Sequence, residues 1–200
     1  MKSQFLYLAS QSPRRSQLLQ QIGVRHELLL PDQDEDVESL EEALPGEGPK
    51  SYVQRVTRLK WDAAIDRLKR RNLPMAPVLC ADTTVALGRR IMGKPADQAQ
   101  AREMLTALSD KDHRVYTAVA VGTPRGLRTA CSVSVVRFDR LTPAWIKMYV
   151  ASGEPMGKAG AYAIQGLAAT RIASVRGSYS GIMGLPLRET AQLIERWIDL

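Results

Sequence analysis

The sequence of 200 residues has very few of the residues on which disulfide, zinc and histidine chemistry depend. It contains two cysteines and two histidines. A disulfide framework or a paired-cysteine zinc site needs more cysteines, and His26 and His113 alone argue against a histidine-based triad or zinc centre. Cys80 and Cys131 stand in apolar, strand-like runs, so we expect buried structural thiols and a reducing, cytoplasmic environment.

Long apolar runs and the common short motifs are also absent. No apolar stretch approaches the roughly 18 residues of a membrane-spanning helix. The opening MKSQFLYLAS leads from a short apolar run into a patterned helix, which predicts a first strand rather than a signal peptide. The motifs GxxxxGK[ST], GxGxxG, GxSxG and HExxH do not occur. We therefore expect no membrane partner, and the remaining candidates for chemistry are carboxylates, cations and backbone amides.

Negative charge is in deficit, with 21 acidic against 28 basic residues, a net charge of +7 and a pI near 9.6. Such a balance indicates an anionic partner, which composition alone leaves open between nucleic acid, a membrane surface and a phosphorylated small molecule. The densest basic run, at 68–71, ends a predicted helix, where cations suit the helix dipole. The other basic residues are scattered, which does not favour nucleic-acid binding.

The hydrophobic pattern predicts alternating strands and helices. We expect strands at 5–9, 26–30, 77–87, 91–95, 114–122, 128–138 and 170–177. We expect helices at 13–22, 50–71, 98–108, 144–152 and 185–200, with Asp97 and Thr142 as the N-caps of the third and fourth. This order predicts an α/β protein with a mixed sheet flanked by helices, and we expect one domain over residues 1–200 with two lobes around a cleft.

The stretch LASQSPRRSQLL joins the first strand to the first helix. It gathers Ser10, Ser12, Arg14 and Arg15 around the amino end of a helix. Backbone amides at a helix start and paired guanidinium groups suit a phosphate. The alternative is a capped surface helix, with Ser12 as the N-cap and Pro13 as the first helical residue. The stretch alone leaves both open.

Other charged residues stand where apolar ones are expected. Asp82 interrupts a buried strand, and Lys60 lies inside the apolar arc of the helix at 50–71. A hydrogen-bonded turn residue and a snorkelling lysine are the ordinary alternatives. With Lys94 in GKP and Glu35 in an acidic loop, however, these residues supply what phosphoanhydride chemistry needs, namely oxygen ligands for a hard cation and several positive charges.

Three blocks carry a family resemblance. LASQSPRRSQLLQQIG, ADTTVALGRRIMGKP, and YVASGEPMGKAGAYAIQG followed by GSYSGIMGLPL resemble the signature blocks of the Maf family of nucleoside triphosphate pyrophosphatases. The resemblance implies a cytoplasmic, usually dimeric enzyme of the inosine-triphosphatase-like (Maf/Ham1) fold. It also implies hydrolysis of a nucleoside triphosphate to the monophosphate and pyrophosphate, with Mg²⁺ or Mn²⁺ as the divalent cation.

The resemblance also implies roles for single residues. Asp82 corresponds to the general base, and Lys60 and Lys94 to lysines of the cleft. Asp82 and Glu35 are the expected metal ligands. The expected substrate-binding residues are Ser10, Ser12, Arg14, Arg15, Thr83 and Gln165.

Three residues bear on specificity. The dTTP and UTP branch of the family is marked by an arginine, a threonine and a glutamine, which are Arg14, Thr83 and Gln165 here. We therefore expect pyrimidine triphosphates, standard or modified, as substrates. The alternatives are hydrolysis of 7-methyl-GTP or another non-standard nucleotide, and inhibition of septum formation by binding alone.

Overall fold

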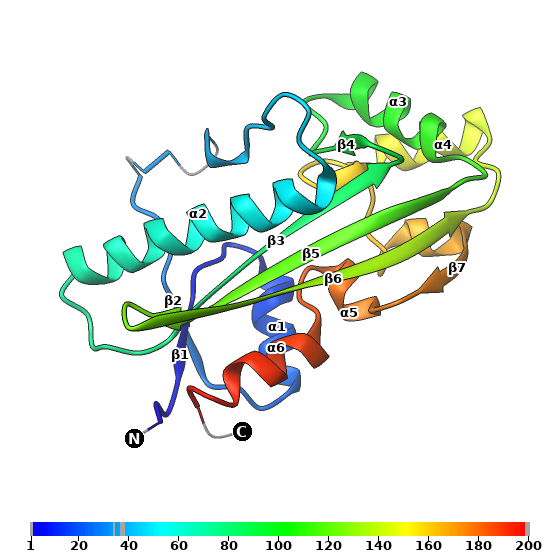
Figure 1. Cartoon of the computed structure of the whole chain (residues 1–200). Helices are drawn as coiled ribbons and strands as arrows, with labels where there is room; N and C mark the ends of the chain where they lie inside the picture. The colour runs from blue at the N-terminus through cyan, green and yellow to red at the C-terminus, as the bar shows by residue number, and fades with distance from the viewer. Residues whose placement is uncertain (1, 34, 37–38, 199–200) are drawn as a thin grey trace.

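The computed structural model describes residues 2–33, 35–36 and 39–198 (Figure 1). Within these residues a mixed sheet has the order β2-β1-β3-β5-β6-β7, and β4 pairs with β3 beside that path. The strands are β1 (Leu6–Leu8), β2 (His26–Leu28), β3 (Val78–Leu87), β4 (Arg90–Met92), β5 (Asp112–Thr123), β6 (Gly126–Phe138) and β7 (Ile172–Arg176). The α-helices are α1 (Pro13–Gln21), α2 (Pro49–Arg70), α3 (Gln98–Leu108), α4 (Pro143–Ala151), α5 (Tyr179–Met183) and α6 (Leu187–Ile194). Short 3₁₀ helices are η1 (Ser39–Glu41), η2 (Ala159–Ala161) and η3 (Leu167–Arg171).

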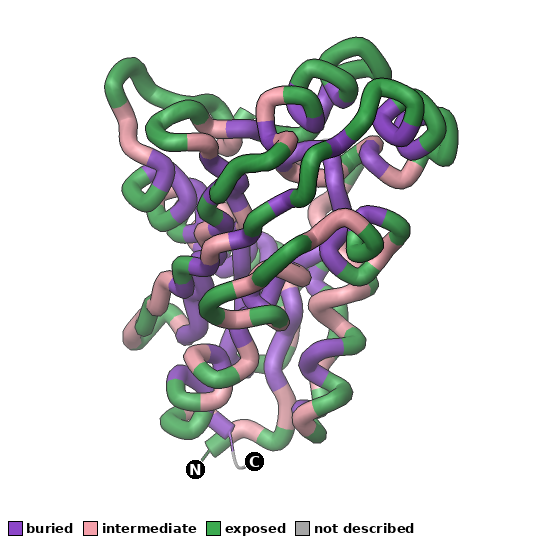
Figure 2. The backbone as a smooth tube through the Cα atoms, turned by 90° about the vertical axis from the view of Figure 1, so that its right-hand side faces the viewer, coloured by how far each residue is buried: buried purple, intermediate pink, exposed green. Residues whose placement is uncertain are grey.

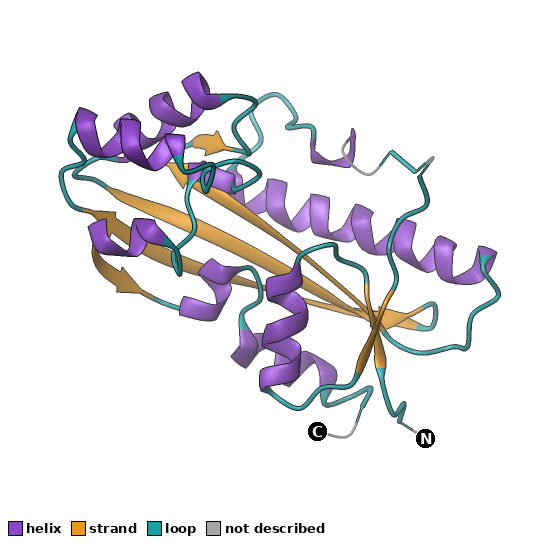
Figure 3. Cartoon of the chain, turned by 180° about the vertical axis from the view of Figure 1, so that it is seen from behind, coloured by secondary structure: helices purple, strands orange, loops and turns teal. Residues whose placement is uncertain are grey.

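The sheet combines parallel and antiparallel pairs, as the sequence predicts. β1 runs parallel to β2 and β3, whereas β3, β5, β6 and β7 are antiparallel neighbours. The helix α2 covers one face, and α1 and α6 cover the other (Figures 1 and 3). The prediction of an α/β fold with a mixed sheet flanked by helices is confirmed.

Two of the groups of buried side chains mark the two lobes. One surrounds α3 and α4 and takes Val85, Val115 and Val136 from the central strands. The other lies around α1 and α6 and takes Leu79 and Val119 from the same strands. Buried segments accordingly run through the middle of the molecule (Figure 2). The long strands β3, β5 and β6 thus connect both lobes.

Helix starts follow the predicted capping chemistry at two of three positions. The Asp97 carboxylate accepts a hydrogen bond from the Gln100 amide at 2.7 Å, and the Thr142 hydroxyl accepts one from the Trp145 amide at 3.2 Å. Ser12 occupies the N-cap of α1, but its side chain makes no capping hydrogen bond. Its amide instead donates to the Ser10 hydroxyl at 3.2 Å.

The carboxyl end of the described chain differs from the prediction. The helix expected over 185–200 is shorter, since α6 ends at Ile194. The following segment turns to meet the start of the chain, where the Ser3 amide donates to the Trp197 carbonyl at 2.8 Å. This long-range pairing competes with continuation of the helix. No helix among the described residues combines the length and apolar character of a membrane span.

A gap in the strand pairing creates an opening at one edge of β3. Along that edge β1 pairs with Val78 and Leu79, and β4 pairs with the residues from Val85 to Leu87. Between these partners no strand of the described chain pairs with residues 80–84 on that side. The opposite edge is paired with β5 from Val78 to Ala86. Asp82 and Thr83 therefore sit where the sheet is open on one side.

Candidate active site

A cavity of about 530 Å³ lies at this opening. Its size falls within the range usual for small-molecule sites. Side chains reach it from the β1–α1 junction, from α2, from β3 and from the link between α5 and α6. Eight of the residues predicted from sequence line it: Ser10, Ser12, Arg14, Arg15, Lys60, Asp82, Thr83 and Lys94.

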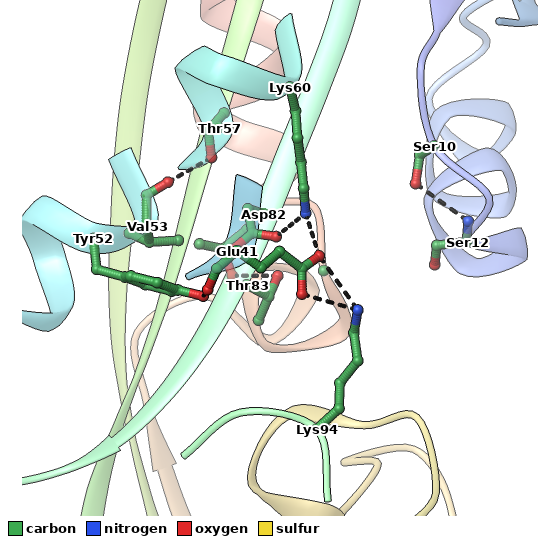
Figure 4. Close-up of polar contacts among 12 residues, drawn as sticks. Ser10, Ser12, Glu41, Tyr52, Val53, Thr57, Lys60, Asp82, Thr83 and Lys94 are labelled. Carbon is green, nitrogen blue, oxygen red and sulfur yellow. Dashed lines mark hydrogen bonds and ion pairs between the residues drawn. The ribbon is translucent and has the colours of Figure 1, made fainter. Parts of the chain in front are cut away.

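Two carboxylates and two ammonium groups meet in one cluster on the cavity wall (Figure 4). Lys60 Nζ donates to Asp82 Oδ1 at 2.6 Å and to Glu41 Oε1 at 2.7 Å. Lys94 Nζ donates to Glu41 Oε2 at 3.0 Å. The Asp82 and Glu41 carboxylates therefore share one ammonium group, and Glu41 joins the two lysines.

The position of Lys60 follows from the pattern of α2. Val56 and Ala64, one turn before and one turn after it, are fully buried, so Lys60 also faces the sheet. Burial lowers the pKa of Lys60, but the charges of Asp82 and Glu41 outweigh burial and raise that pKa overall. For Glu41 the signs are opposite: burial raises the pKa of its carboxyl group, but the Lys60 ammonium outweighs burial, and the pKa is lowered overall. Both shifts favour the ionised forms, so Lys60 and Glu41 form an ion pair at neutral pH.

The β1–α1 junction is fixed to the link between α5 and α6 by its arginines. Arg15 Nε donates to the Gly184 carbonyl at 2.8 Å, and Arg15 Nη1 donates to the Ser10 hydroxyl at 3.0 Å. Arg14 Nε donates to the Met183 carbonyl at 3.3 Å. Both guanidinium groups are thus held at the cavity beside the start of α1, where backbone amides and the helix dipole favour an anion.

Thr83 belongs to a hydrogen-bond chain of fixed direction. The Thr117 hydroxyl donates to the Gly181 carbonyl at 2.7 Å, and it lies 3.0 Å from the Thr83 hydroxyl. Because Thr117 has a single hydroxyl proton, Thr83 must be the donor in the contact between them. The Thr83 oxygen therefore has only acceptor capacity left for a ligand.

Glu35 is not brought to this cluster. Both its carboxylate oxygens accept from Arg67 Nε, at 3.1 and 3.0 Å, and it also pairs with Arg70. Arg67 is 2% exposed, and its Nη1 donates to the Leu29 carbonyl at 2.9 Å. The structure thus places Glu35 in an ion pair that ties the acidic loop to α2. Among the described carboxylates of this loop, it is Glu41 that shares Lys60 with Asp82.

Gln165 lies beside the cavity rather than in its wall. It is exposed, while its neighbour Ile164 is buried and lines the cavity. Glu154 braces this segment, because its carboxylate accepts from the Tyr149 hydroxyl at 2.8 Å and from the Leu167 amide at 3.0 Å. The role of Gln165 in specificity stays a prediction.

Sequence reasoning missed three charged residues that line the cavity, Glu41, Arg67 and Lys158. Arg67 lies seven residues after Lys60, two helical turns along the same face of α2, and this spacing was a usable signal. Lys158 stands in the glycine-rich block GKAG. Glu41 is one of several acids in its loop and has no distinguishing spacing. Among the described residues no group of three or more His, Cys, Asp and Glu side chains is arranged to hold a metal ion.

The fold and the cavity define an α/β protein with an interlobe site for an anionic ligand, in which arginines lie on one wall and a lysine–carboxylate cluster on another. The chain belongs to the Maf family, since the family model described as Maf-like protein matches residues 5–197.

Several relatives match almost the whole chain. A protein from Albidiferax ferrireducens, named dTTP/UTP pyrophosphatase, is 64% identical over 193 residues, which cover 96% of each chain. Proteins of the same name from Polaromonas sp. and Cupriavidus pinatubonensis are 62% and 59% identical, over 95% and 96% of this chain and 94% and 96% of theirs. A crystal structure of a nucleoside-triphosphatase / dITP/XTP pyrophosphatase from Mycobacterium abscessus covers 68% of this chain and 75% of that chain, with 16% identity and a TM-score of 0.40.

Proposed function

We propose that this chain hydrolyses dTTP and UTP to the monophosphate and pyrophosphate. The observation that carries the proposal is the shared cavity, in which the Asp82–Lys60–Glu41–Lys94 cluster and the arginines at the start of α1 line one space. The names of relatives that are about 60% identical over nearly the whole chain support these substrates. None of those names favours the 7-methyl-GTP alternative or a purely binding role.

The chain's own residues divide the work on the triphosphate. Arg14, Arg15, Ser10 and Ser12 bind phosphate oxygens at the start of α1, where the guanidinium groups are already held in place. Lys60 and Lys94 neutralise the charge that develops on pyrophosphate as it leaves. Preorganised donors of this kind each contribute on the order of a hundredfold or more to kcat.

Asp82 positions and deprotonates the attacking water molecule. It orients a water molecule for attack at the α-phosphorus and accepts a proton from it as the new P–O bond forms. The bond between the α-phosphorus and the bridging oxygen breaks, and pyrophosphate leaves with the bond's electron pair. Lys60 holds the Asp82 carboxylate in position across 2.6 Å during this step.

A divalent cation fits the donor set at Asp82. Magnesium is commonly held by one or two carboxylates together with substrate phosphates, and Asp82 provides such a carboxylate at the open edge of β3. When bound, Mg²⁺ or Mn²⁺ would activate water and neutralise phosphate charge. A free aspartate, with a pKa near 3.9, is a weak base, so this contribution matters for the rate.

The test measures pyrophosphate release from dTTP, UTP, GTP, 7-methyl-GTP and ITP, each with Mg²⁺ and with Mn²⁺. We expect a preference for dTTP and UTP and a loss of at least a hundredfold in kcat for Asp82→Asn. The matched control is Asp62→Asn, because the Asp62 side chain is 44% exposed on α2 and pairs along that helix with Arg58. Undiminished activity of Asp82→Asn would overturn the role of Asp82, and a preference for a guanine nucleotide would overturn the specificity.

We also propose that the protein works as a cytoplasmic homodimer and that residues 1–200 form one domain, as the family resemblance implies. Light scattering coupled to size exclusion should give twice the mass of 22.1 kDa. Urea unfolding should give one transition at the same concentration by fluorescence and by circular dichroism.

A further inference from the structure

Glu41 occupies an unusual place for an acidic residue in a site that is proposed to bind triphosphate. Its carboxylate lies between the two lysines of the cleft, at 2.7 Å from Lys60 Nζ and 3.0 Å from Lys94 Nζ. A bare triphosphate that approached these lysines would meet a fixed negative charge. Either Glu41 leaves the cluster or a positive charge enters with the nucleotide.

The loop that carries Glu41 is fastened to α2 on both sides of the carboxylate. The Tyr52 hydroxyl donates to the Glu41 backbone carbonyl at 2.7 Å. Arg55 Nη2 donates to the neighbouring Glu42 carbonyl at 2.7 Å, and Arg55 also pairs with Glu47. These contacts hold the Glu41 backbone in place at the cavity. Departure of the whole segment would break all of them, so the backbone keeps the Glu41 side chain within reach of the two lysines.

Asp82 and Glu41 already converge on one positive charge. Lys60 Nζ lies at 2.6 Å from one carboxylate and at 2.7 Å from the other. Two carboxylates that meet around a single cation in a cavity of this size match the protein share of a magnesium–triphosphate site, in which the phosphates supply further oxygens. Glu35 lacks this placement, because Arg67 holds both its oxygens.

We propose that Glu41 is the second carboxylate at the divalent cation and that it makes nucleotide binding depend on the metal. The inference rests on the proposed function. In the metal-bound complex Glu41 accompanies Asp82, and the charge of the cation offsets the repulsion between Glu41 and the triphosphate. Without the metal, the same carboxylate repels the nucleotide from Lys60 and Lys94. Glu41 thereby favours the metal–nucleotide complex over free nucleotide.

The experiment measures binding rather than turnover. The α,β-methylene analogue of dUTP is titrated into wild type and Glu41→Gln by calorimetry, once with Mg²⁺ and once with EDTA. Wild type should bind the analogue more tightly with Mg²⁺. The ratio of the affinity with Mg²⁺ to the affinity with EDTA should be lower in Glu41→Gln than in wild type by about ten- to hundredfold, which corresponds to the loss of one charge-assisted contact. Mn²⁺ binding in the presence of the analogue, followed by the loss of the free Mn²⁺ spin-resonance signal, should weaken in parallel.

Two further variants sharpen the result. Glu42→Gln makes the same change of charge one residue away, at an exposed side chain, and should keep the wild-type ratio. Glu41→Asp keeps the charge but shortens the reach, and should lie between wild type and Glu41→Gln. The melting temperatures of all variants show whether each is folded before titration.

Four outcomes would overturn the inference. A metal dependence that is unchanged in Glu41→Gln would remove Glu41 from the metal site. Equal tightening of binding with and without Mg²⁺ would show that Glu41 is displaced by the nucleotide instead. Loss of the metal dependence in Glu35→Gln alone would assign the second carboxylate to Glu35. Absence of analogue binding in wild type with Mg²⁺ would overturn the proposed function as well, so the two failures are distinguishable.

Discussion

Lys60 Nζ lies 2.6 Å from Asp82 Oδ1, and this ion pair joins the middle of α2 to the open edge of β3. The two side chains are 18% and 12% exposed. Loss of either partner leaves a charge that is largely shielded from water, whereas loss of both removes the imbalance.

We expect Lys60→Met to lower kcat on dTTP by on the order of a hundredfold or more and the free energy of unfolding by about 1–3 kcal/mol. In a double-mutant cycle with Asp82→Asn, the two losses of stability should sum to more than the loss in the double variant. Arg58→Met, which breaks an exposed pair on the same helix, should cost less than about 1 kcal/mol. Additive losses would contradict the coupling.

Arg15→Lys tests the fixed arginine at the start of α1. Arg15 donates from two nitrogens to two separate partners, Ser10 and Gly184. A lysine ammonium is a point charge and cannot reproduce this fork. We expect the free energy of unfolding to fall by about 1–2 kcal/mol and KM for dTTP to rise. The control, Arg25→Lys on an exposed side chain, should change neither. A variant with wild-type unfolding and KM would refute the anchoring role.

Gly160→Ala tests the close approach of η2 to β3. Gly160 has a φ of 69°, and a Cβ there would lie 2.8 Å from Val85 Cγ1. We expect a loss of about 1–3 kcal/mol in the free energy of unfolding. Gly157→Ala is a matched control, since Gly157 has the same φ of 69° and no atom within 4 Å of its Cβ position. It should lose only the backbone cost, about 1 kcal/mol. Val85→Ala, combined with Gly160→Ala, should recover part of the extra loss of stability. Equal losses in Gly160→Ala and Gly157→Ala would exclude a clash.

His113 makes stability depend on pH. Burial lowers its pKa to about 4, and its Nε2 lies 2.8 Å from the Tyr162 hydroxyl. In the unfolded chain the pKa returns to about 6.5. Below that pH the unfolded state binds a proton that the folded state does not, so stability is full above about pH 6.5 and falls as the pH drops toward 4, by up to about 3 kcal/mol.

Urea unfolding at pH 7.5 and pH 5 measures this loss. The carboxyl groups of Glu35 and Glu41 also have lowered pKa values, but their stabilisation is lost as the pH falls through and below the ordinary glutamate range, so most of it is still present at pH 5. His113→Phe should flatten the dependence, whereas His26→Gln should leave it in place. A decline that persists in His113→Phe would assign it to another group.

Local pattern was sufficient to predict much of the fold and part of the site. The apolar arc of α2 predicts that Lys60 faces the sheet, and the structure places it there, because helix periodicity alone fixes which side chains point inward. Caps at Asp97 and Thr142 are equally local. At the junction around Ser10 and Arg15, residue types alone left a phosphate site and a capped surface helix both open, and the structure places these side chains in the cavity wall.

Long-range contacts decided the rest. The hydrogen bonds from Tyr52 and Arg55 to the acidic loop determine which of its carboxylates reaches the cleft. The sequence of the loop itself does not indicate these contacts. The end of α6 depends on pairing with Ser3 at the other end of the chain. Neither contact leaves a periodic signal in the local sequence.

The strands that pass through both lobes also set the mechanics of the cleft. β3 and β5 are hydrogen-bonded without interruption from Val78 to Ala86, directly behind the opening. A hinge motion at that point would break these hydrogen bonds, so the part of the sheet that forms the floor of the cleft is rigid. We therefore expect capture of a ligand to involve rearrangement of the loops that border the opening, while the spacing between the floor's charges is preset. Such a site would select its ligand by length, because the distances between its charged groups are fixed before binding and do not depend on closure of the lobes.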